Sequence, residues 1–110
     1  MPIVFNEKTR IFQINTPNTT YMMGLYADGY LLHLYYGRRV EDTDCRYLIG
    51  RDESEWDLHN LKRDGVDFLG RTSFEYPASG TGDYRDNCLC VRDEGGHRVC
   101  RLTYESHRIF

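Results

Sequence analysis

The fold class is decided by residues 21–36, which read YMMGLYADGYLLHLYY. Within them Tyr21, Met23 and Leu25 occupy every second position, which is the period of a half-buried β-strand. The Asp-Gly pair that follows favours a tight hairpin turn, because it tolerates positive φ. A run of apolar and tyrosine residues comes after the turn. The stretch therefore predicts two antiparallel strands joined by a short turn.

The flanking sequence extends this pattern in both directions. Upstream, Phe12 and Ile14 share one face of a short strand. Downstream, residues 88–104 alternate around a glycine-rich turn at 93–96 and predict a second hairpin. Nine tyrosines, five phenylalanines and only three prolines also favour strands over helices. The sequence therefore predicts an all-β fold, an antiparallel β-sandwich whose early strands occupy residues 1–40.

Residues 41–77 break the pattern with a long, irregular, acidic loop. A loop of this length is uncommon in a compact domain unless it serves a function or packs against another part of the protein. It contains Trp56, the single tryptophan, among several carboxylates. An aromatic face beside carboxylates suits a sugar ring, and the alternative is that the indole fixes the loop to the sheet. The residues leave both interpretations open.

Length, charge and hydropathy exclude several classes of protein. A chain of 110 residues is enough for one domain, and its net charge of −3 with interleaved signs disfavours nucleic-acid binding. No apolar run reaches the roughly 20 residues that a membrane helix needs. The N-terminus lacks the basic start and apolar core of a secretory signal. We therefore expect a cytoplasmic protein whose four cysteines are reduced thiols.

Three cysteines and a histidine near the C-terminus carry side chains that can bind zinc: Cys88, Cys90, His97 and Cys100. Structural zinc sites commonly show a paired cysteine knuckle twice, and the second pair is missing from this sequence. On a strand Cys88 and Cys90 point to the same face, where cysteine is a small buried hydrophobic residue. The sequence therefore predicts core cysteines and no metal site, with a small zinc module as the least favoured alternative.

A second informative segment, EYPASGTGDYR, occupies residues 75–85. Gly80 and Gly82 allow the backbone to turn sharply or to approach another chain. Asp83 and Arg85 fall on one side of an extended segment, where they can pair or reach outward. A phosphate-binding loop is disfavoured, because neither a Lys-Ser or Lys-Thr pair nor a strand-to-helix context accompanies the glycines. The residues by themselves predict a structured loop.

This signature segment closely resembles the Glu-Tyr-Pro and Gly-Thr-Gly-Asp-Phe-Arg signature in the N-terminal domain of the α-galactosidases of glycoside hydrolase family 36. Residues 33–39, HLYYGRR, resemble a strand end of that family, and residues 104–109, YESHRI, resemble a third element. The three motifs occur in the family's order and span most of the chain. Two departures are Tyr84, where phenylalanine is usual, and the loop of residues 41–67, which matches the family poorly.

The resemblance implies that the chain is an incomplete part of a large N-terminal β-sandwich, the supersandwich domain. In that family a (β/α)8 barrel follows, and its two aspartates remove terminal α-1,6-linked galactose from melibiose- and raffinose-type oligosaccharides by a retaining mechanism. Neither aspartate is expected within residues 1–110, so the chain alone is not expected to be catalytic. No metal or other cofactor is implied. The implied partners are the galactoside substrate, the chain's own barrel and further copies in a homotetramer.

The resemblance also suggests which residues meet substrate. In bacterial members of the family, loops of the N-terminal domain reach the active site of a neighbouring subunit. The expected contacts lie in the acidic loop and the signature segment: Asp52, Glu53, Trp56, Asp83 and Arg85. The alternative is a free-standing carbohydrate-binding β-sandwich, which binding of galactose or raffinose by the chain alone would favour.

Overall fold

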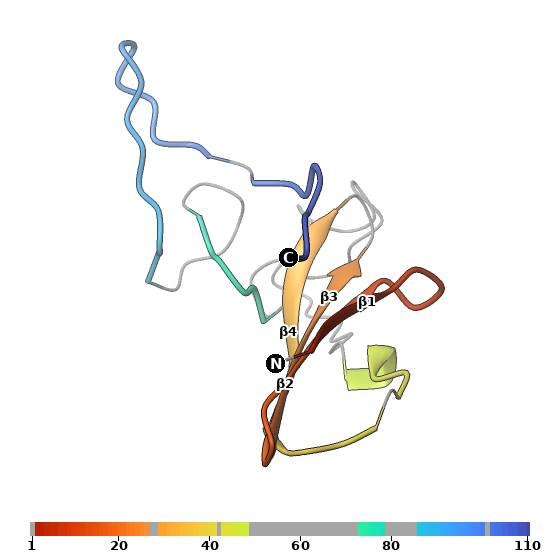
Figure 1. The fold of residues 1–110 in the computed structure, drawn as a ribbon. Coiled ribbons are helices and arrows are strands. Elements are labelled where there is room, and N and C mark those ends of the chain that lie inside the picture. Colours follow the sequence, from red (N-terminus) through yellow and green to blue (C-terminus); the bar gives the residue numbers. More distant parts are fainter. Residues whose placement is uncertain (1, 27–28, 42, 49–72, 79–85, 101) are drawn as a thin grey trace.

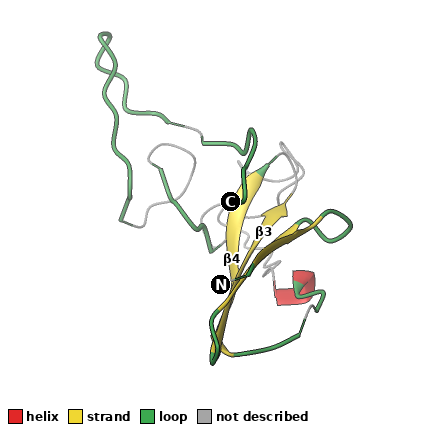
Figure 2. Cartoon of the chain, in the orientation of Figure 1, coloured by secondary structure: helices red, strands yellow, loops and turns green. Residues whose placement is uncertain are grey.

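The computed structural model describes residues 2–26, 29–41, 43–48, 73–78, 86–100 and 102–110 of the chain. Within them four strands form one antiparallel sheet in the order β1-β2-β3-β4, and a short 3-10 helix follows (Figure 1). The elements are β1 (Ile3–Asn6), β2 (Ile11–Asn15), β3 (Thr19–Tyr26), β4 (Tyr30–Arg38) and η1 (Arg46–Leu48). Figure 2 shows the other described residues as loop. The prediction of an all-β, antiparallel fold is confirmed.

The turn predicted between β3 and β4 depends on its glycine. Gly29 has a φ of 99°, and its N–H donates to the carbonyl oxygen of Tyr26 at 3.2 Å. A Cβ at this position would also lie 3.3 Å from the backbone nitrogen of Tyr104. Glycine is therefore required both by its left-handed backbone and by the closeness of the C-terminal segment.

A β-bulge interrupts the pairing of β3 with β4. Met23 pairs with His33 and Met22 pairs with Tyr35, which leaves Leu34 as an extra residue on β4. In a bulge, two residues of one strand oppose a single residue of its partner. Leu34 and Tyr35 accordingly both pack in the cluster that contains Met22. After the bulge, each side chain of β4 points to the side of the sheet opposite to the one it would face in a regular strand.

The most buried side chains lie on the face of the sheet that carries Met22, which has no exposed surface. Met22 packs with Ile11, Leu34 and Cys45 in one apolar cluster, and Leu32 lies in a second cluster. Cys45 comes from the segment after β4, so this segment covers part of the sheet and supplies the core from outside the strands.

The alternation in β3 did not predict which of its faces lies deeper. Thr20 has no exposed surface, whereas its neighbour Tyr21 is half-buried. A polar network accounts for the burial of Thr20. Its hydroxyl donates to Asn15 Oδ1 at 2.7 Å, while Gln13 Nε2 donates to the same oxygen at 3.0 Å and to Val40 O at 3.1 Å. Each buried amide or hydroxyl replaces water by a protein partner, so a polar strand face can be covered.

Residues 73–75, which lead into the signature segment, extend the sheet beyond β4. Two backbone hydrogen bonds hold them there: His33 N donates to Ser73 O at 2.7 Å, and Glu75 N donates to Leu31 O at 3.0 Å. Between these bonds an isolated antiparallel bridge is formed. Backbone groups therefore fix the position of residues 73–75 relative to β4.

The C-terminal segment returns to the sheet and packs through its aromatic residues. Tyr104 N donates to Gly29 O at 2.7 Å. The ring of His107 lies 4.5 Å from that of Phe5 and 4.8 Å from that of Phe12, both in edge-on geometry. The motif at residues 104–109 is thus held against β1 and β2 by aromatic contacts and against the β3–β4 turn by a hydrogen bond.

Residues 86–100 form an arm that extends away from the sheet (Figure 1). At its tip Gly96 N donates to Asp93 O and Asp93 N donates to His97 O, both at 3.0 Å. These bonds form a turn where the sequence predicted one. On either side of the turn no strand is assigned within the described residues, so the two arms of the predicted hairpin do not form a regular ladder.

The cysteines are distributed differently from the prediction. Cys88 and Cys90 are exposed, and the prediction that they are core residues is wrong, because the arm that carries them lies away from the sheet. Cys45 is the buried cysteine. Among the described residues, no group of three or more His, Cys, Asp and Glu side chains is arranged to hold a metal ion. The described part also contains no helix of the length and apolar character needed to cross a membrane.

The edge strand β1 leads to a first prediction. Val4 is 46% exposed, and no described strand pairs with the outer side of β1. Open strand edges pair with other chains, so we expect the purified 110-residue chain to self-associate. Light scattering should show a mean mass that rises with concentration, and Val4→Lys should reduce this rise. A monomer with a sharp melting transition that is independent of concentration would contradict the prediction.

Candidate functional site

Three titratable side chains from distant parts of the sequence meet on the face of the sheet opposite Met22. The hydroxyl of Tyr21 donates a hydrogen bond to Glu75 Oε1. His33 Nδ1 lies 3.2 Å from the Tyr21 hydroxyl oxygen and 3.7 Å from Glu75 Oε2. The cluster of Tyr21, His33 and Glu75 therefore connects β3, β4 and the signature segment through side chains.

The bulge in β4 brings a fourth residue to this cluster. His33 and Tyr36 are three positions apart and would face opposite sides of a regular strand. Because Leu34 is the extra residue of the bulge, both side chains reach Tyr21: the ring centroids lie 5.2 Å away for His33 and 5.8 Å away for Tyr36. Tyr36 is 68% exposed, so an open aromatic surface borders the cluster.

The electrostatics of the cluster favour a neutral phenol beside a carboxylate. Burial, the hydrogen bond to Glu75 and the negative charge of that residue together raise the pKa of Tyr21 to about 12. Glu75 Oε2 is buried and accepts no hydrogen bond from the described residues. Tyr21 therefore acts as a hydrogen-bond donor and not as a base. Glycosidases use two carboxyl groups, and this cluster contains one, so it is suited to holding the signature segment in place and not to cleaving a glycosidic bond.

The raised pKa of Tyr21 gives a second prediction. The folded state holds the phenolic proton more tightly than the unfolded state, in which the pKa has the ordinary tyrosine value of 10.0. The resulting stability is fully present below pH 10 and is lost as the pH rises from 10 toward 12. We expect the phenolate absorbance of one tyrosine to appear only near pH 12, and Tyr21→Phe to remove this step from the titration. A titration curve that is the same in both proteins would contradict the assignment.

The five residues that the sequence analysis assigned to substrate lie outside the described residues: Asp52, Glu53, Trp56, Asp83 and Arg85. Their roles stay predictions. The cluster of Tyr21, His33 and Glu75 was not predicted from the sequence, although two signals were present. Glu75 begins the signature segment, and His33 is a histidine placed between two leucines of a strand.

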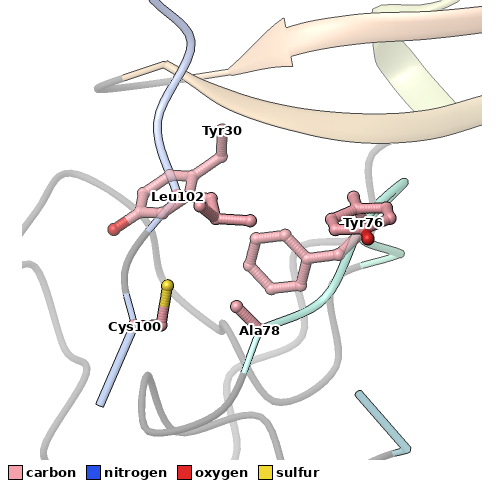
Figure 3. A pocket seen from close by; sticks show the side chains of 6 residues that line it. Tyr30, Tyr76, Ala78, Cys100 and Leu102 are labelled. Carbon is pink, nitrogen blue, oxygen red and sulfur yellow. The ribbon is translucent and has the colours of Figure 1, made fainter. Parts of the chain in front are cut away.

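A small cavity lies where residues 74–78 meet β4 and the C-terminal segment (Figure 3). Its volume is about 20 Å³, and it is lined by Tyr30, Phe74, Tyr76, Ala78, Cys100 and Leu102. A cavity needs about 10–15 Å³ to hold one water molecule, so this one has room for roughly a single water and none for a sugar. It marks a packing contact among three segments of the chain.

Comparison with known proteins agrees with the arrangement of these motifs. The family model of the glycosyl hydrolase family 36 N-terminal domain matches residues 29–110, which include all three motif segments. The chain belongs to glycoside hydrolase family 36.

Two bacterial relatives match the whole chain. The bifunctional α-galactosidase/sucrose kinase AgaSK of Mediterraneibacter gnavus is 34% identical over 110 residues, which are 99% of this chain and 12% of that protein. The α-galactosidase AgaA of Geobacillus stearothermophilus is 31% identical over 110 residues, which are 100% of this chain and 15% of that protein. The chain of this family 36 member therefore spans less than a sixth of the length of either relative.

Solved structures of these enzymes share the fold. The galactosidase domain of AgaSK superposes with a TM-score of 0.82 at 32% identity, over 96% of this chain and 15% of that one. AgaA in complex with raffinose gives a TM-score of 0.78 at 31% identity, over 89% of this chain and 14% of that one. The family 36 domain described here therefore has the same fold as the corresponding part of larger α-galactosidases.

Proposed function

We propose that the chain is the N-terminal, non-catalytic part of an α-galactosidase. The observation that carries this proposal is the match of residues 29–110 to the family 36 N-terminal domain. Relatives named as α-galactosidases align with the full chain but extend far beyond it. In this proposal the catalytic carboxylates belong to the part of the enzyme that these relatives possess in addition.

The proposed reaction is the hydrolysis of terminal α-1,6-linked galactose from melibiose- and raffinose-type oligosaccharides. It proceeds with retention, through a covalent glycosyl-enzyme formed on one carboxylate while a second acts as acid and then as base. Doubly substituted variants of the relative AgaA were solved in complex with raffinose and with stachyose, which supports this class of substrate. No metal or other cofactor enters the proposed reaction.

The proposed role of this domain is to support the barrel and a homotetramer, and to place loop residues near an active site. The cluster of Tyr21, His33 and Glu75 serves this role by tying the start of the signature segment to β3 and β4. Asp83 and Arg85 follow that anchor by eight and ten positions. The exposed arm of residues 86–100 offers surface for contacts with the barrel or a second subunit. The cytoplasmic location stays a prediction.

The proposed function is tested with the full-length protein and raffinose. We expect release of galactose, and proton NMR at early times should show the α-anomer first, as retention requires. The 110-residue chain alone should release none. Initial formation of the β-anomer would contradict the retaining mechanism, and the absence of galactose release from raffinose, melibiose and a chromogenic α-galactoside would contradict the function. Light scattering of the same protein tests the tetramer.

A further inference from the structure

The β1–β2 turn and η1 project to the same side of the sheet (Figure 1). Side chains from both line an open groove. Its volume is about 550 Å³, and it is lined by Thr9, Arg10, Leu25, Tyr26, Asp44, Arg46 and Tyr47. Ligand sites commonly measure about 300–1,000 Å³ and combine apolar walls with a few fixed polar groups. The groove therefore has the size of a ligand site and a polar lining that ordinary packing does not require.

The groove contains both donors and acceptors in fixed positions. Arg46 forms a paired contact with Asp44, in which Nε donates to Oδ1 at 2.9 Å and Nη2 donates to Oδ2 at 2.7 Å. This contact and the hydrogen bond from the Arg46 N–H lower the pKa of Asp44, so its carboxylate stays charged at neutral pH. The guanidinium of Arg10 makes no hydrogen bond or ion pair with any described residue. Its five N–H donors are available to a ligand.

Two tyrosines add aromatic surface to the same groove. Tyr47 is 77% exposed, and Tyr26 is half-buried at the end of β3. The neighbouring Cys45 is buried against Ile11 and Met22, which fixes the backbone that carries Asp44, Arg46 and Tyr47. The backbone at Tyr47 is therefore held in place by the buried Cys45, two positions earlier in the chain. An aromatic ring on a fixed backbone is suited to stacking against a ligand.

The backbone of Arg10 carries an independent sign of function. Its φ is 57°, in the left-handed region, where glycine and asparagine are favoured over other residues. The turn requires this conformation, because Arg10 N donates to Asn6 O at 2.7 Å and Arg10 O accepts from Leu25 N at 3.0 Å. The turn therefore contains an arginine in a backbone conformation that favours glycine or asparagine. Strained residues of this kind concentrate at functional sites.

The mixture of groups indicates the chemistry of the ligand. The charges of Asp44 and Arg46 compensate each other, so the groove offers the guanidinium of Arg10 beside a neutral pair that contains both donors and acceptors. A neutral chain of hydroxyl groups can accept from the guanidinium groups, donate to Asp44 and stack a ring on Tyr47. We propose that this groove binds an oligosaccharide chain through Arg10, Asp44, Arg46 and Tyr47. The inference rests on the proposed function, which supplies an oligosaccharide as substrate.

The test measures stachyose binding to the full-length protein by calorimetry. 1-Deoxygalactonojirimycin, with which the relative AgaA was crystallised, is added at a concentration that abolishes hydrolysis of p-nitrophenyl α-galactoside. We expect the wild type to bind stachyose under these conditions. Arg10→Asn and Tyr47→Ala should each weaken binding by at least about tenfold, as expected for the loss of one hydrogen bond to a charged group or one stacked ring.

Matched substitutions outside the groove separate binding from folding. Lys8→Asn lies in the same turn as Arg10, and Tyr76→Ala removes another exposed tyrosine, and both should keep the affinity within about twofold. Arg10→Asn should melt at the same temperature as the wild type or higher, because asparagine accepts the left-handed backbone. The combination of equal or greater stability with weaker binding is not expected of a structural residue.

Two results would overturn the inference. One is that the inhibited wild type binds no stachyose, as it would if other parts of the enzyme cover the groove. The other is that Arg10→Asn and Tyr47→Ala bind it as tightly as the wild type. Failure of the proposed function is recognised separately, because the wild type would then leave p-nitrophenyl α-galactoside intact. In that event the same titration without the inhibitor decides whether the groove binds stachyose.

Discussion

Replacing Met22 by alanine is expected to lower the free energy of unfolding by about 2–5 kcal/mol, the range for a long apolar side chain removed from a closed core. Met22 has no exposed surface and contacts side chains from three separate segments. The bulge in β4 turns Leu34 and Tyr35 toward it together, and Cys45 closes the cluster from the other side. Because β2 and β4 are fixed by backbone pairing with β3, they cannot collapse fully into the space that alanine leaves.

The adjacent methionine provides the matched control. Met23 lies on the same strand with its side chain on the opposite face, where it is only half-buried. Met23→Ala should therefore cost less than half as much as Met22→Ala. Urea unfolding followed by far-ultraviolet circular dichroism measures both losses under identical conditions. Equal losses for the two substitutions would show that the two faces of β3 contribute alike, against the burial described above.

The difference in burial between Met22 and Met23 separates the features of the fold that the sequence predicts from those that it does not. Alternation and the Asp-Gly pair predict β3, β4 and the turn at Gly29, because strand period and turn chemistry are local properties. The deeper face of β3 is not a local property. It depends on Val40, which lies across this face after β4, and on the side-chain amides of Gln13 and Asn15. The Gln13 amide donates to the carbonyl oxygen of Val40 and to the side-chain oxygen of Asn15. Polar residues buried by long-range hydrogen bonds have no pattern that distinguishes them from solvent-exposed ones.

The candidate sites were predictable to different degrees. The residues of the motif that begins at Glu75 are distinctive in the sequence. Its contact with Tyr21, however, depends on the bulge and on the bridge between Leu32 and Phe74, which are 42 positions apart. A bulge exchanges the faces of a strand without changing its composition. The prediction that Cys88 and Cys90 are core residues was wrong for a related reason, because alternation in the sequence was taken as evidence of pairing with a neighbouring strand. Their arm has the period of a strand but no neighbouring strand in the described residues.

Replacing Tyr21 by phenylalanine is expected to lower the free energy of unfolding by about 1.5–3 kcal/mol, the range for a hydrogen bond to a charged group. The substitution removes the donor to Glu75 Oε1 while Oε2 already lacks a hydrogen bond from the described residues. The side chain of Glu75 is 24% exposed, so water reaches it incompletely. Tyr35→Phe is the matched control, because its hydroxyl donates to Arg38 O at an exposed position and should contribute less than about 0.5 kcal/mol.

A double substitution distinguishes the hydrogen bond from the rest of the contact. Glu75→Leu in the Tyr21→Phe background removes the carboxylate that the first change left unsatisfied, so the double variant should be more stable than Tyr21→Phe alone. Amide exchange gives the local readout: the N–H of His33, which donates to Ser73 O at 2.7 Å, should exchange faster in Tyr21→Phe and recover in the double variant. If the two losses simply add, Tyr21 and Glu75 act independently and the cluster does not hold the signature segment. If the double variant recovers, the phenol and the carboxylate together fix the segment that precedes Asp83 and Arg85 in the sequence.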